Sequence, residues 1–89
     1  MRRIVMLEKI YCKNNDEYKI YNKGILFNNG LALNETSSFI FLACDSKNTI
    51  LDIAKKLTVE YNVSLEEAQL DVIQCVEELT ENELVIKMM

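Results

Sequence analysis

The side chains that could carry chemistry in this 89-residue chain are mainly acidic, with fourteen Asp and Glu against ten Lys and Arg and no histidine. Histidine is the usual general base near neutral pH, and no other catalytic pattern replaces it. There is no glycine-rich phosphate loop, no nucleophile elbow and no acid pair in an evident pocket. The acids of residues 77–83 form a charge run that is typical of a solvated helix face. We therefore expect a binding module and not an enzyme.

Three cysteines, Cys12, Cys44 and Cys75, are the remaining reactive side chains. They are odd in number and far apart, whereas disulfide frameworks and zinc sites use clustered ligands. We expect three reduced thiols that pack as small hydrophobic side chains in a cytoplasmic protein, with no metal and no cofactor.

Composition limits the class of protein and its partners. The chain is 49% hydrophobic and 27% charged, which is typical of one small globular domain. A net charge of -4 repels phosphate backbones and anionic lipid, so we expect neither nucleic acid nor membrane as a partner. The apolar run at residues 4–7 is too short for a signal peptide, and no run reaches the length of a membrane span.

The first third of the chain reads as strands and turns. Strands are predicted by β-branched and aromatic runs at Ile4 to Cys12, Tyr18 to Tyr21, Ile25 to Asn28 and Leu31 to Asn34. Asn29-Gly30 joins the last two as a type I′ turn, because both central residues of that turn need positive φ. The prediction is an N-terminal antiparallel sheet of three strands, or of four if the first strand joins it, over residues 1–34.

A two-residue loop at Asn29-Gly30 sets the register of this hairpin, with Phe27 opposite Ala32. The two faces would then be Leu26, Leu31 and Leu33 on one side and Ile25, Phe27 and Ala32 on the other. Both are apolar, so the second needs a cover, which the N-terminal strand, a second copy in a homodimer or a bound peptide would each supply. If Leu31 to Leu33 is the edge strand, its spare backbone groups can pair with an added peptide strand.

The rest of the chain reads as three helices, defined by their capping residues. The first follows Asn34, the second follows Thr49 with Asp52 three residues on, and the third follows Ser64 with Glu67 three residues on. The predicted spans are about 35–43, 50–61 and 65–82, with a polar turn at 44–48 and a C-terminal tail at 83–89. The fold class is therefore α+β, with the sheet before the helices.

The third helix carries two apolar sectors. At 100° per residue, the core stripe comprises Leu65, Ala68, Val72, Val76 and Leu79, with Cys75 at its margin. Leu70 and Ile73 project onto a second sector, together with Glu66 and Glu77. Two interpretations stay open: a peptide groove against Leu31 to Leu33, whose acidic rim suits a basic partner, or a solvated face with scattered apolar residues.

Spaced positions between about residues 18 and 86 resemble the PqqD-like family, whose members are also called RiPP precursor peptide recognition elements and act as peptide chaperones. The residues that carry the resemblance are Leu33-Asn34-Glu35-Thr36, Phe39-Ile40, Asp45, Ile53-Ala54, Leu57, Tyr61, Val63, Asp71-Val72, Leu79 and Leu84-Val85. The chain departs from the family pattern at Glu83, where a glycine usually precedes the final Leu-Val, and in its long N-terminal strand.

The resemblance implies a winged helix-turn-helix-like fold that binds the leader of a ribosomally made precursor peptide as an added strand. It implies a cleft between the third strand and the third helix, lined by Leu31, Ala32 and Leu33 and by Gln69, Leu70, Ile73 and Glu77. Asp71 is either a cleft residue or a helix-face charge. The implied enzyme partner is a radical SAM maturase or, in lasso peptide pathways, a leader peptidase.

Two other classes of protein share some of these sequence features. A winged-helix DNA-binding regulator would share the fold but should carry basic residues on its recognition helix, and residues 65–82 contain none. Asp45-Ser46 before a helix is similar to the phosphopantetheine site of an acyl carrier protein. However, Lys47 stands where an apolar residue is expected, and a β-rich first third does not fit a helical bundle.

Overall fold

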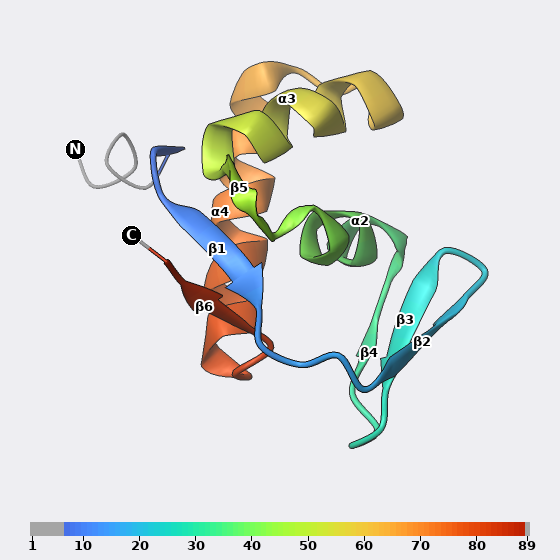
Figure 1. Cartoon of the computed structure of the whole chain (residues 1–89). Coiled ribbons are helices and arrows are strands. Elements are labelled where there is room, and N and C mark those ends of the chain that lie inside the picture. The colour runs from blue at the N-terminus through green and yellow to red at the C-terminus, as the bar shows by residue number, and fades with distance from the viewer. Residues whose placement is uncertain (1–6, 89) are drawn as a thin grey trace.

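A computed structural model describes residues 7–88 of the chain (Figure 1). Its strands and helices, in chain order, are β1 (Ile10–Lys13), β2 (Tyr18–Tyr21), β3 (Gly24–Phe27), β4 (Ala32–Leu33), α2 (Glu35–Ala43), β5 (Asp45–Thr49), α3 (Ile50–Tyr61), α4 (Leu65–Glu81) and β6 (Val85–Lys87). The predicted α+β class, a three-stranded antiparallel sheet followed by three helices, is confirmed.

The strands form two antiparallel sheets of three, ordered β2-β3-β4 and β5-β1-β6. Figure 1 shows β1 and β6 beside α4, with β2, β3 and β4 on the other side of α2. The N-terminal strand therefore does not extend the hairpin sheet. It is the centre of the second sheet, where Cys12 lies opposite both Asp45 and Ile86.

Three predicted segments need correction in this second sheet. The strand expected from Ile4 begins at Ile10, and residues 4–6 lie outside the described residues. The expected turn at 44–48 is mostly strand β5, and the expected tail contains strand β6. Each of these short strands is stabilised by hydrogen bonds to β1, more than thirty residues away along the chain, so its own composition gives little sign of it.

The two hairpin turns also differ from the prediction. Asn22 and Lys23, between β2 and β3, have φ of 48° and 71°, and they form the two-residue loop closed by Tyr21 and Gly24. The loop between β3 and β4 has three residues, because the Phe27 N–H donates to the Leu31 carbonyl at 2.8 Å. Gly30, with φ of 95°, takes the left-handed position of this longer loop.

The extra loop residue shifts the register by one and exchanges the two faces of β4. Leu33 lies opposite Ile25, and Ala32 lies opposite Leu26. Leu33 therefore joins buried Ile25 on the core side, while Leu26 is 43% exposed on the outer face beside exposed Ala32. The predicted pairing of Leu26 with Leu33 is wrong, because a slip of one residue reverses every side chain of a strand.

The predicted helix starts are confirmed at the atomic level. The Asn34 side-chain oxygen accepts from the Ser37 N–H at 2.9 Å. Thr49 and Asp52 form a reciprocal capping box, with distances of 3.1 and 3.0 Å. Ser64 Oγ accepts from the N–H three residues on, at 3.1 Å. These bonds fix the entry of each helix and hence the direction in which its side chains project.

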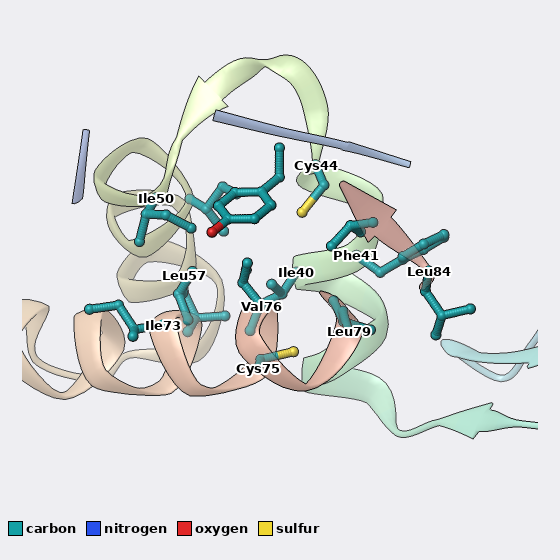
Figure 2. Close-up of a cluster of buried hydrophobic side chains, with 14 of the residues drawn as sticks. Ile40, Phe41, Cys44, Ile50, Leu57, Ile73, Cys75, Val76, Leu79 and Leu84 are labelled. Atoms are coloured by element: carbon teal, nitrogen blue, oxygen red, sulfur yellow. The ribbon is translucent and has the colours of Figure 1, made fainter. Parts of the chain in front are cut away.

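One core joins the two sheets to the helices (Figure 2). Phe41 of α2 is fully buried, with its ring centroid 5.3 Å from those of Tyr18 and Phe27. Two residues of α4 differ from the predicted core stripe. Ile73, predicted on the second sector, is only 8% exposed and belongs to the core, whereas Leu65, predicted in the stripe, is 41% exposed. Within residues 7–88, none of the helices combines the length and the apolar composition needed to cross a membrane.

Candidate functional site

A groove separates β4 and the start of α2 from the C-terminal half of α4. It consists of two hollows, of about 360 and 170 Å³, that adjoin each other and share the lining residues Asn34, Ser37, Cys75 and Glu78. We call it the β4–α4 groove. Its other lining residues are Leu31, Ala32, Leu33, Thr36, Ile40, Asp71, Gln74, Leu79, Glu81, Asn82 and Leu84.

The β4 wall of the groove is a sheet edge. The Leu31 carbonyl accepts from the Phe27 N–H, so it points toward β3. Backbone groups alternate in direction along an antiparallel strand, and the N–H and C=O of Ala32 therefore point away from β3, toward the open edge. Leu31 and Leu33 turn their side chains to the core side. This wall combines unpaired backbone groups with an apolar surface, as a site for an extended peptide requires.

The α4 wall is one face of the helix. Asp71, Cys75, Glu78 and Asn82 recur at intervals of four, three and four residues, which places them in one row along the helix. Helix α4 does not pack directly against β4 at this face. The first turn of α2, with Asn34 and Ser37, lies between them at one end of the groove. The groove is thus a consequence of where α2 sits.

The groove has a negative potential. Burial raises the pKa of the Cys75 thiol to about 11, a hydrogen bond with Ser37 opposes this change, and the charges of Glu78 and Asp71 add to it. The acids that line the groove are Asp71, Glu78 and Glu81, and no Lys or Arg among residues 7–88 lines it. Because its pKa is raised, Cys75 is a poor nucleophile and serves as part of the apolar floor.

The structure brings only part of the predicted site together. Leu31, Ala32 and Leu33 line the groove as expected, and Asp71 lies at its α4 wall. The four expected α4 residues Gln69, Leu70, Ile73 and Glu77 do not line it. Ile73 is buried in the core, and Leu70 is 41% exposed. Burial raises the pKa of Tyr11 in β1, and the charge of Glu77 adds to this change.

The four predicted α4 residues lie outside the groove because of the position of α3. This helix packs along α4 and covers the flank that carries Ile73, so the open flank is the opposite one. Cys75, Glu78 and Asn82 line the groove and were not among the residues predicted for the site. Their regular spacing after Asp71 was visible in the sequence, but spacing alone does not say which sector of a helix faces the sheet.

A larger hollow, of about 660 Å³, opens between α2, β5 and α3. Its neighbouring edge strand is β5, where Asp45 Oδ1 accepts from the N–H groups of Lys47 and Asn48, both at 3.0 Å. These hydrogen bonds hold the pKa of Asp45 below its usual value. Because two β5 donors are already bonded, this hollow suits an added strand less well than the β4–α4 groove does.

Comparison with known families matches residues 16–85 to the family described as Coenzyme PQQ synthesis protein D (PqqD). The chain belongs to the PqqD family. Proteins of this family bind a precursor peptide and work with a partner enzyme in biosynthesis. No curated protein and no solved structure matches the chain.

Membership of the PqqD family also bears on the two alternatives of the sequence analysis. Ser46, the residue similar to a carrier-protein attachment site, lies within β5 at φ of 72° and not at the start of a helix. Helix α4, which would have to contact DNA, has the acids Glu66, Glu67, Asp71, Glu77, Glu78 and Glu81 and no base. Neither a carrier protein nor a DNA-binding regulator is supported.

Proposed function

We propose that this protein binds the leader of a ribosomally synthesised precursor peptide in the β4–α4 groove and delivers it to a modifying enzyme, without catalysing a reaction itself. The observation that carries the proposal is the open edge of β4 facing a groove walled by α4, in a chain of the PqqD family. Because the ligand is a newly translated peptide, the proposal places the protein in the cytoplasm.

Binding would take place by strand addition. The N–H and C=O of Ala32 would pair with one residue of the leader, which would lie antiparallel or parallel to β4 as a fourth strand of the β2-β3-β4 sheet. Alternate leader side chains would then face the groove, whose floor comprises Cys75, Leu79 and Leu84. Main-chain hydrogen bonds supply affinity and these side chains supply specificity.

The enzyme partner that we propose is a radical SAM maturase. The same binding step would serve a leader peptidase of a lasso peptide pathway, and the genes beside this one distinguish the two. A radical SAM enzyme with a short open reading frame supports the first partner, and a peptidase with a cyclase supports the second.

The direct test is a backbone amide NMR titration with the peptide encoded by that short open reading frame. We expect chemical shift changes at residues 31–33 and at Asp71, Cys75, Glu78 and Asn82. Changes confined to the sector of Leu70 and Glu77 would move the site to the opposite flank of α4. An unchanged spectrum at saturating peptide would contradict leader binding.

A backbone variant tests strand addition itself. Ala32→Pro removes the N–H that points to the open edge, and proline is tolerated on edge strands. We expect the leader to bind roughly three- to tenfold more weakly, which corresponds to the loss of about one hydrogen bond and its geometry. Ala32→Ser keeps the N–H and should bind as wild type. Equal affinity in both variants would rule out pairing at Ala32.

A further inference from the structure

The charge distribution of the β4–α4 groove is one-sided along its whole length. Asp71 lies at one end, Glu78 belongs to both hollows, and Glu81 lies at the other end. The first basic residues before and after β4 in the sequence are Lys23 and Lys47, and Lys23 already lies 3.9 Å from Glu35. These groove acids differ from Glu66 and Glu77, the two that the sequence analysis placed at the rim.

The length of the groove limits how much of a peptide it reads. Asp71 and Glu81 are ten residues apart on α4, or about 15 Å at 1.5 Å per residue. An extended strand rises about 3.3 Å per residue, so roughly five peptide residues span this distance. Side chains alternate across a strand, and about three of the five therefore face α4.

The surface that meets those side chains has two levels. Its floor is apolar, formed by Leu79, Leu84 and the thiol of Cys75, which is 7% exposed. Its α4 rim carries exposed carboxylates, including Glu78. Lys and Arg can lay an aliphatic stem along an apolar floor while the charged end reaches a rim, whereas Asp and Glu would be repelled there.

We propose that this groove selects leader segments in which Lys or Arg alternates with an apolar residue, so that both point to α4 from positions two residues apart. The proposal rests on the proposed function, since it names the class of peptide that the same site takes. On this proposal, the acids that line the groove on α4 help to select the peptide, in addition to keeping the helix hydrated.

The experiment is a selection from a displayed library of random twelve-residue peptides against the full chain. Binders are sorted by their response to Ala32→Pro, and those that weaken are groove binders. Among these we expect enrichment of Lys or Arg two residues from Leu, Ile, Val, Met or Phe. Affinities of individual peptides are then measured by fluorescence anisotropy.

Two neighbouring glutamates provide a matched pair of variants. Glu78→Gln should weaken the groove binders roughly two- to fivefold, the range expected for one exposed ion pair, and Glu78→Lys should weaken them further. Glu77→Gln changes the same charge one residue away, outside the groove, and should leave affinity unchanged. Raising the salt concentration from 0.05 to 0.5 M should weaken wild-type binding and have less effect on Glu78→Gln.

The outcomes separate the inference from the proposed function. Groove binders without basic enrichment, or with equal responses to Glu78→Gln and Glu77→Gln, would overturn the inference and leave strand addition in place. If no binder responds to Ala32→Pro, both the inference and strand addition at β4 are overturned. Basic enrichment together with selective loss in Glu78→Gln supports both.

Discussion

Two edge strands lie near the C-terminal half of α4, and they meet it differently. β6 packs against the helix, with Val85 fully buried and the preceding Leu84 1% exposed. β4 stands away from the same helix, and the space between them is the β4–α4 groove. The comparison shows that an open sheet edge becomes a candidate peptide site only where another element holds it apart from its neighbour.

That element is α2. Its Phe41 packs against Tyr18 and Phe27 and so fastens the helix to the β2-β3-β4 sheet. At the same C-terminal end of α2, Lys13 Nζ of β1 donates to the carbonyls of Leu42 and Cys44 at 2.9 and 3.2 Å. Helix α2 is thus tied to both sheets, and the following variants test what each contact contributes.

The largest effect is expected at the aromatic contact that holds α2 against β2 and β3. Phe41→Ala leaves a cavity in the core and should lower the free energy of unfolding by about 3–5 kcal/mol. Leu42→Ala, at the next residue, removes a side chain that is 38% exposed and should cost less than about 1 kcal/mol. Urea denaturation measures both. Similar losses would show that Phe41 is not the anchor.

The second test compares two residues of α4 that the sequence placed in one sector. Ile73→Ala should lower the free energy of unfolding by about 2–4 kcal/mol, because Ile73 is buried beside α3. Leu70→Ala should cost less than about 1 kcal/mol, because Leu70 is 41% exposed. A large drop in leader affinity for Leu70→Ala would return the site to the flank first predicted.

The third test makes the same backbone change at each edge strand. Met88 N–H donates to the Ile10 carbonyl at 2.7 Å, so by alternation the Lys87 N–H points away from β1, as that of Ala32 points away from β3. Lys87→Pro should leave leader affinity unchanged, while Ala32→Pro lowers it roughly three- to tenfold. Isothermal titration calorimetry measures both, and equal losses would mean that the two edges are equivalent.

A smaller effect is expected at the end of α4. Glu83 has φ of 59°, and its N–H donates to the Thr80 carbonyl at 3.0 Å, while the Leu84 N–H donates to the Leu79 carbonyl at 2.9 Å. This is a Schellman ending with a non-glycine residue in the left-handed position. Glu83→Gly should raise the free energy of unfolding by about 0.5–1 kcal/mol. Thermal unfolding that shows a loss would contradict this assignment.

The smallest effect distinguishes two buried thiols. With a pKa raised to about 11, Cys75 is almost entirely protonated at pH 8, and its alkylation rate should rise about tenfold per pH unit up to that value. Bound leader should slow alkylation of Cys75, which lines the groove, but not that of Cys44, which lies in the core. Mass spectrometry of iodoacetamide-treated protein reports each site, and equal protection would argue against occupancy of the groove.

Features set by neighbouring residues were predictable from the sequence. The caps at Asn34, Thr49 and Ser64 need only the first turn of each helix, and the helix bounds follow from them. The register of the β3–β4 hairpin was not predictable, because Asn29-Gly30 is typical of a two-residue turn and yet lies in a loop of three residues. One loop residue then reversed the faces of β4.

In the candidate site, too, the part set by neighbouring residues was predicted from the sequence, and the part set by distant contacts was not. Residues 31–33, which line the groove, were predicted for the site because an edge strand beside a turn is a local property. On α4 the sequence predicted the flank that carries Glu77, whereas the groove lies along the flank that carries Glu78. Which flank stays open depends on where α3 packs, and no local pattern in α4 encodes that. Strands β5 and β6 were missed for the same reason, because both depend on β1.

The pairing of β1 with β6 has a practical consequence for how the protein can be attached to something else. Tyr11 lies opposite Lys87, so the first and last described strands are neighbours. Figure 1 shows them beside α4, with β4 beyond α2 on the other side. We therefore expect that a fused domain, a fluorescent reporter or a tether to a sensor surface attached on the side of β1 and β6 leaves the mouth of the groove uncovered. Covalent linkage to a second protein is therefore compatible with peptide capture.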